Sequence, residues 1–153
     1  MGLCLGFYGD VQVTMLGMTK RQFLKRTKEC LDAQGIHVLN ISELIDLELS
    51  GRINKTDSYK RIMAVMKDLD SIFTKYHNLD PPFECVKTKQ SILNSLLILQ
   101  EAATAVYDSN PRELSNENLK FDKTKIKDSQ LFLNKFRQVF GPLTREIDEY
   151  LKA

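Results

Sequence analysis

Oxygen-bearing side chains recur between residues 46 and 57 at a spacing that suits the binding of a hard cation. Calcium takes six to eight oxygen ligands at about 2.3–2.6 Å, mostly from carboxylates and carbonyls. A chain that turns sharply within this segment brings such oxygens together, so the segment predicts a calcium site and no other cofactor. The candidate ligands are Asp46, Glu48, Ser50, Asn54 and Asp57.

The spacing within this segment resembles the calcium-binding loop of EF-hand proteins. Gly51 stands at the sharp-turn position of that loop, and Ile53 stands at its β-pairing position. The last ligand is Asp57, where the EF-hand pattern has the longer glutamate, and the sequence contains no second loop. The alternative interpretation is a helix that ends at Gly51, a turn, and a new helix capped by Asn54 or Thr56.

Residues that carry catalysis or bind zinc are sparse in this sequence. Neither of the two histidines, His37 and His77, has a cysteine, histidine or carboxylate partner at zinc spacing. Nucleophile elbows, phosphate-binding loops and dinucleotide fingerprints are absent, so we expect no enzyme. The three cysteines, Cys4, Cys30 and Cys85, do not make a disulfide framework. The last two fall on apolar helix faces, which predicts buried free thiols.

Charged residues nearly balance, with 22 Lys and Arg against 20 Asp and Glu and a formal net charge of +2. So small an excess predicts no bulk attraction to nucleic acid. Two segments, 19–33 and 120–137, are richer in basic than in acidic residues. One interpretation is that they form solvated helix surfaces, and the alternative is that they contact a phosphate-rich partner. The start Met1-Gly2-Leu3-Cys4 resembles that of a doubly acylated protein, which makes a membrane surface a second partner to consider.

Apolar residues recur every three to four positions over most of the chain, which is the pattern of amphipathic helices. Thr19 and Gln22 form a capping box for a first helix, and Gly35 is placed to end it. Residues 36–41 are a predicted connector, and Ser42 starts a short second helix. Longer helices are predicted over 56–76, from 82 or 83 to 107, and over 123–140, where Gly141 and Pro142 bend or interrupt the last one.

Three long amphipathic helices and the shorter ones must cover their apolar faces against one another, so the predicted fold class is all-α. We expect an antiparallel bundle of three to four main helices, with one or two short helices and an irregular N-terminal arm. Residues 1–18 form this apolar arm, in which 11–15 alternate like a short strand, and residues 19–153 form one domain. Four aromatic residues share the helical phase of the aliphatic ones and are expected in the core: Tyr59, Phe73, Tyr76 and Phe83.

Three features of the middle of the chain occur together: Ser-Gly-Arg-Ile-Asn at 50–54, the Leu-Asp-Pro-Pro break at 79–82, and a long helix on each side of that break. This combination resembles small helical proteins of Gram-positive bacteria, many of which are lipoproteins tethered to the membrane. The resemblance implies a protein associated with the cell envelope, and it implies no catalytic residue. Cys4 follows Leu3, which departs from the small residue expected before an acylated cysteine.

Strong helix-packing signals without catalytic groups favour a non-enzymatic helical bundle that acts through protein–protein interaction. A calcium-binding module at 46–57 is the first alternative. The second alternative is a peripheral protein that attaches to acidic lipid through the basic first helix and the apolar arm. The sequence leaves open whether the chain acts in the cytoplasm or at the cell envelope, and it leaves the oligomeric state open.

Overall fold

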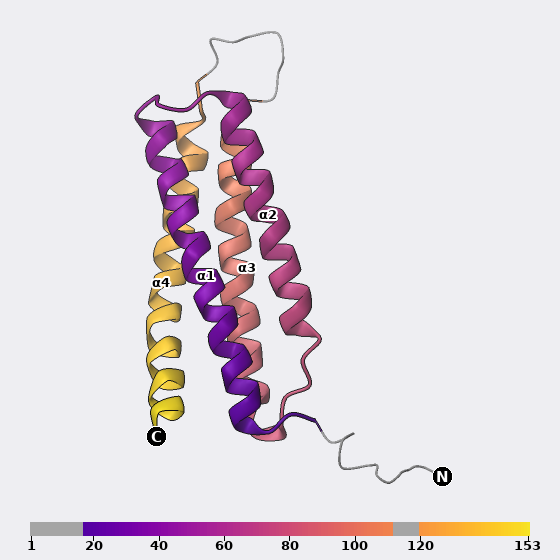
Figure 1. Ribbon diagram of the computed structural model, residues 1–153. Helices are drawn as coiled ribbons and strands as arrows, with labels where there is room; N and C mark the ends of the chain where they lie inside the picture. Colours follow the sequence, from indigo (N-terminus) through magenta and orange to yellow (C-terminus); the bar gives the residue numbers. More distant parts are fainter. Residues whose placement is uncertain (1–16, 112–119) are drawn as a thin grey trace, which may run out of the picture.

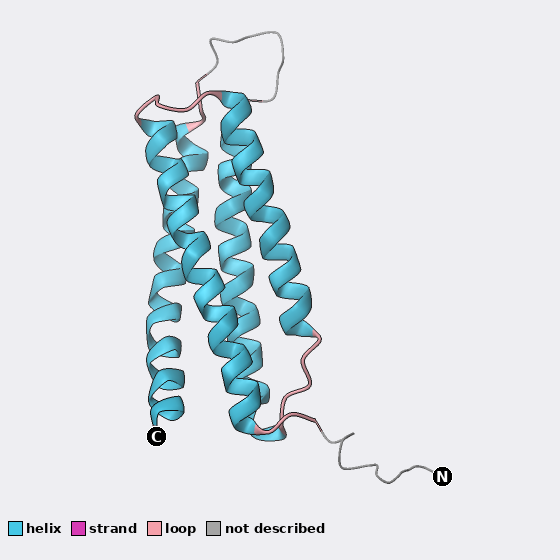
Figure 2. Cartoon of the chain, viewed as in Figure 1, coloured by secondary structure: helices cyan, strands magenta, loops and turns pink. Residues whose placement is uncertain are grey.

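The computed structural model describes residues 17–111 and 120–153, which form a bundle of long helices (Figure 1). The helices run side by side and alternate in direction, so that their connections lie at the two ends. Figure 2 shows helices and loops but no strand in these described residues. The predicted all-α antiparallel bundle is confirmed. The elements are α1 Lys20–Leu49, α2 Lys55–His77, the short 3₁₀-helix η2 Phe83–Cys85, α3 Val86–Ser109 and α4 Lys123–Lys152.

The four long helices are unequally enclosed. Among them, α3 contacts all three others, whereas α2 contacts only α1 and α3, and α4 also contacts only α1 and α3. The helices α2 and α4 therefore occupy opposite sides of the bundle. Each helix contributes large, fully buried side chains to one common core, including Phe23 and Leu31 of α1, Leu69 of α2, Leu96 of α3 and Phe136 of α4.

The first helix begins as predicted but does not end where predicted. The Gln22 backbone N–H donates to Thr19 Oγ1 at 3.1 Å, and the Thr19 N–H donates to Gln22 Oε1 at 3.0 Å, which completes the capping box. The predicted end at Gly35 is wrong, because α1 continues through Gly35 to Leu49. Gly35 lies close to α4, where an added Cβ would be 3.6 Å from Phe140 Cζ.

The predicted connector over 36–41 and the separate short helix after it are therefore parts of α1. Val38 and Ile41 are buried and continue the apolar stripe that begins at Phe23. An uninterrupted helix keeps these side chains on the face that meets the core, so packing overrides the local tendency of glycine to end a helix.

The turn between α1 and α2 follows the alternative interpretation of residues 46–57. The chain reverses at Gly51, whose φ of +68° is a left-handed conformation that glycine adopts without steric cost. Asn54 then caps α2, because its side-chain oxygen accepts a hydrogen bond from the Asp57 N–H at 2.8 Å.

The four aromatic residues expected in the core, three on α2 and one on η2, differ widely in burial. Tyr76 is buried, and its ring centroid is 5.7 Å from that of Phe23. Phe73 is half-buried and Tyr59 is 39% exposed. The expectation that Phe83 packs in the core is wrong, because Phe83 is 94% exposed at the start of η2, outside the helical phase of α2.

The last helix is continuous. Asp122 caps it by accepting a hydrogen bond from the Thr124 N–H at 2.9 Å. It then passes through Gly141 and Pro142 as a single helix. Pro142 is exposed, and the buried Ile147 holds the following turns against the core.

The predicted N-terminal arm lies almost wholly outside the described residues, as does the strand-like segment at 11–15. Of its last two residues, Met18 packs against the core, and Gly17 lies beside Asp80 between α2 and η2. No helix in the described part of the chain is both long and apolar enough to cross a membrane.

Candidate functional site

The five residues predicted to bind calcium lie around the end of α1 and the start of α2, with their side chains in different surroundings. Glu48 is buried, whereas Asp46 and Ser50 are exposed. Asn54 and Asp57 pair with each other: besides the capping bond, the Asn54 amide nitrogen donates to Asp57 Oδ2 at 3.2 Å.

Calcium binding by this segment would need these oxygens to converge on one point. Over residues 17–111 and 120–153, no three His, Cys, Asp or Glu side chains lie close enough together to hold a metal ion. Calcium binding therefore stays a prediction, and it requires Glu48 and Asn54 to exchange their present partners for the ion.

Glu48 instead joins three helices at one end of the bundle. Its carboxylate accepts hydrogen bonds from the Ser58 hydroxyl of α2 and, at 3.0 Å, from the Ser109 hydroxyl of α3. Beside them, the Asn110 side chain donates to the Lys55 carbonyl at 2.8 Å. We call Glu48, Ser58, Ser109 and Asn110 the polar junction. Burial raises the pKa of the Glu48 carboxyl, and the two serine hydrogen bonds offset part of this effect.

A hollow of about 680 Å³ opens beside the polar junction, between the α1–α2 turn and the start of α4. Its apolar lining includes Leu49 and Phe121, and its basic lining consists of Lys55, Lys120 and Lys123. We call this space the junction hollow. Among the described residues, Glu48 is the one carboxylate that lines it, so the charges of these residues favour an anion over a cation.

A second hollow lies between α2 and α3, and we call it the α2–α3 groove. Its volume is about 650 Å³. Met63 and Met66 of α2 form its apolar wall, and Gln100 and Thr104 of α3 line the opposite side. Met63 is 40% exposed, which is unusual for a residue on the apolar stripe of a helix in a bundle.

Apolar surface extends beyond the α2–α3 groove along both helices. Leu97 is 45% exposed, and it precedes Thr104 by seven residues, or two helical turns, so both lie on one face of α3. Near one end, the rings of Tyr59 and Tyr107 pack with their centroids 5.8 Å apart. The sequence indicated that Tyr59 and Met63 belong to an apolar stripe, but helical phase alone does not distinguish its covered part from its uncovered part.

Several polar groups inside the bundle are hydrogen-bonded to one another. Tyr76 Oη and Thr27 Oγ1 share a hydrogen bond of 2.8 Å. Gln34 donates to Cys30 Sγ at 3.4 Å and accepts from Ser95 Oγ at 2.9 Å. Desolvation raises the pKa of the Cys30 thiol to about 11, so at neutral pH it stays protonated and is a poor nucleophile.

The two resolved thiols agree with the sequence-based expectation. Cys30 and Cys85 are both free and buried. Burial also raises the pKa of Cys85. The third cysteine, Cys4, lies outside the described residues.

His37 is a titratable residue whose burial the sequence did not reveal. It is 8% exposed, and its Nε2 lies 3.8 Å from Asp68 Oδ2 of α2, while its Nδ1 has no hydrogen-bond partner. Desolvation lowers the pKa of His37, and the Asp68 carboxylate offsets part of this shift. His37 lies on the face of α1 that carries the apolar stripe. Its contact with Asp68 of α2 distinguishes it from a surface histidine, and this contact depends on the packing of the two helices.

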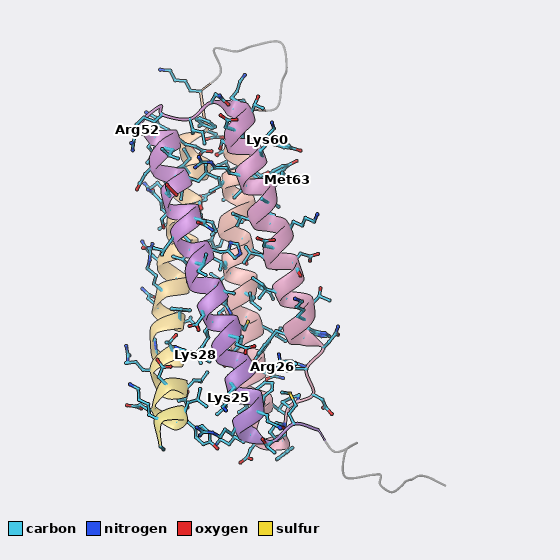
Figure 3. The ribbon with its side chains drawn as sticks, in the orientation of Figure 1. Lys25, Arg26, Lys28, Arg52, Lys60 and Met63 are labelled. Atoms are coloured by element: carbon cyan, nitrogen blue, oxygen red, sulfur yellow. The ribbon has the colours of Figure 1, made fainter. Side chains whose placement is uncertain are left out.

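The basic residues of α1 are largely engaged with other parts of the bundle. Lys20 Nζ lies 4.6 Å from the centre of the Tyr150 ring, and Arg21 donates to the Leu151 carbonyl at 3.1 Å. Lys28 Nζ lies 2.8 Å from Asp148 Oδ1. Lys25 and Arg26 lie in the lower half of the same helix in Figure 3. The first two contacts hold basic side chains against α4, and the ion pair with Asp148 offsets the charge of Lys28, which leaves fewer free basic groups on α1 for acidic lipid.

Comparison with known proteins adds no relative. The chain matches no protein-family model, no curated protein and no solved structure at a significant level. The resemblance to helical proteins of Gram-positive bacteria stays a prediction.

Proposed function

We propose that this chain is a non-enzymatic protein-binding module whose α2–α3 groove receives one amphipathic helix of a protein partner. The observation that carries the proposal is the exposed apolar surface along the groove, with Met63 40% and Leu97 45% exposed. Covering such surface removes it from water, which is favourable by about 25 cal/mol per Å². Methionine side chains adapt their shape readily, which suits a surface that accepts another helix.

The charges beside the α2–α3 groove favour a helix with one acidic and one basic edge. Lys67 and Asp70 line the groove on α2, and Lys60, seven residues before Lys67, lies on the same face of that helix, so two basic residues there oppose one carboxylate. Figure 3 shows Lys60 and Met63 together on the outer side of α2. On α3, the exposed Glu101 lies between Leu97 and Thr104 on the outward face. Opposite charges on the two walls would select the direction of the bound helix.

Synthetic helical peptides can test this proposal without knowledge of the natural partner. All carry the same apolar stripe; one has an acidic and a basic edge, and two controls have both edges acidic or both basic. We expect the mixed-edge peptide to bind most tightly in fluorescence anisotropy. Met63→Glu should weaken its binding by about tenfold or more, because a carboxylate would be buried in the groove.

Leu131→Glu supplies the matched control for Met63→Glu. Leu131 is 59% exposed on α4, which does not contact α2, so this variant should bind the mixed-edge peptide like the unmodified chain. Equal binding of all three peptides, or equal losses in the two variants, would reject the proposal. A concentration-dependent dimer that Met63→Glu abolishes would assign the groove to a second copy of this chain instead.

A further inference from the structure

We propose that the junction hollow binds a phosphate-bearing ligand. The hollow lies where α1 ends and where α2 and α4 begin, and its volume of about 680 Å³ is typical of small-molecule sites. This inference is independent of the α2–α3 groove, which lies between different faces.

The charges around the junction hollow are the first argument for an anion. Lys55, Lys120 and Lys123 line it, while Glu48, the one lining carboxylate in the described part of the chain, is buried against the hydroxyls of Ser58 and Ser109. The lysines alone set the positive potential here, because the C-terminal end of α1 lies beside the N-terminal ends of α2 and α4, and the Asp122 carboxylate already caps α4. A doubly charged cation would meet this potential unfavourably, whereas a phosphate would be attracted.

The polar junction fixes the backbone of Lys55 at the edge of the hollow. The Asn110 amide holds the Lys55 carbonyl at 2.8 Å, and the Asp122 N–H donates to the Ser109 carbonyl at 2.8 Å just before α4 begins. These bonds tie the starts of α2 and α4 to the end of α3. The two basic walls of the hollow are thereby held at a set separation, which reduces the entropy lost on binding.

The apolar walls of the junction hollow suggest what lies next to the phosphate. Leu49 is 48% exposed, and Ile53 and Phe121 are half-buried beside it. Lysine ammonium groups bind phosphate oxygens through charge-assisted hydrogen bonds, while these apolar side chains suit a neighbouring hydrocarbon group. A phosphate ester with an apolar part fits both, whether it is a soluble molecule or a lipid headgroup.

The test compares two double variants that remove the same charge. Lys120→Gln/Lys123→Gln removes lysines that line the hollow, and Lys125→Gln/Lys127→Gln removes exposed lysines of α4 that do not. Binding of short-chain phosphatidic acid, kept below the concentration at which it forms micelles, is measured by calorimetry at constant ionic strength. We expect the first variant to raise its Kd by about tenfold or more and the second to leave it within about twofold.

Two further arms identify the source of the phosphate and the role of charge. Inorganic phosphate tests whether the apolar part contributes, and co-sedimentation with vesicles of phosphatidylcholine and phosphatidic acid tests a lipid surface. The proposal is supported if the unmodified chain binds the soluble ester, with or without binding to vesicles, and if Lys120→Gln/Lys123→Gln abolishes this binding. No binding of any phosphate probe overturns it, as do equal losses in the two double variants. Calcium-dependent stabilisation that Glu48→Gln removes would also overturn it, because the hollow would then take a cation.

Discussion

The helices α3 and α2 are neighbours with similar lengths, but the bundle encloses them to very different degrees. Contacts with three helices bury apolar residues of α3 such as Ile92, Leu96 and Leu99. Contacts with only two helices leave an open face on α2, where Met63 is exposed. The difference separates two uses of apolar side chains: the buried ones, which are most numerous on α3, stabilise the fold, and the exposed ones on the open face of α2, together with Leu97 of α3, are available to a partner.

Replacing one apolar residue on each helix should produce the largest contrast. Leu96 is fully buried, so Leu96→Ala should lower the free energy of unfolding by about 2–5 kcal/mol through lost burial and a cavity. Met63→Ala should lower it by less than about 1 kcal/mol, because much of that side chain already contacts water. Urea unfolding measures both, and similar losses in the two variants would contradict the division between core and open face.

A smaller effect is expected where α1 meets α4, and it would sharpen the same comparison. Gly35→Ala places a methyl group 3.6 Å from Phe140 Cζ, which is an ordinary van der Waals contact. Alanine also loses less conformational entropy than glycine on entering a helix. We therefore expect a gain of about 0.5–1 kcal/mol in the free energy of unfolding, measured by urea unfolding. A loss of stability would mean that the enclosed α1–α4 contact tolerates no added atom.

The smallest expected effect concerns the polar junction, which fastens the start of α2 to α1 and α3. The pKa of the Glu48 carboxyl in the native state is raised above its ordinary value of 4.5. As the pH falls, the native state therefore protonates this carboxyl at a higher pH than the unfolded chain does. The ionised carboxyl therefore costs stability at pH 7, and this cost disappears as the pH falls through the raised pKa towards 4.5. Glu48→Gln should be the more stable protein at pH 7, and the difference should shrink with acidification.

Urea unfolding between pH 7 and pH 4.5 measures the pH dependence of this difference, with the exposed Glu43→Gln as its control. If Glu48→Gln is the less stable protein at pH 7, the hydrogen bonds of Ser58 and Ser109 to the ionised carboxylate outweigh its desolvation. The hydrogen bond from Ser58 to the ionised Glu48 carboxylate would then contribute net stability at the start of α2.

Local signals in the sequence predicted the elements whose ends are set by local hydrogen bonds. The capping box of Thr19 and Gln22 is present, and Asn54 caps α2 through its own side chain. The helix predicted over 56–76 is α2, which ends at His77 just before the break at 79–82. In each case the deciding contact lies within a few residues, where a single sequence contains all of its atoms.

The failures concern positions where distant packing outweighs local preference. Gly35 lies inside α1, because residues further along, such as Ile41, must stay on the buried face. At Gly141 and Pro142 the sequence left a bend or an interruption open, and the structure has a single helix. Calcium binding by residues 46–57 stays a prediction, but the hydrogen bonds of Glu48 come from serines of two other helices, which the local pattern does not contain. Neither the α2–α3 groove nor the junction hollow has a local signal, because each forms only when separate segments of the chain pack side by side.

The most direct test of the central claim is a residue-by-residue map of amide chemical shifts during addition of the mixed-edge peptide. We predict changes on the outer face of α2 around Met63 and along α3 from Leu97 to Thr104, with the surroundings of Leu131 on α4 unaffected. Shifts centred on α4, or no shifts at peptide concentrations up to the millimolar range, would contradict the claim that the open face of α2 is where this bundle binds.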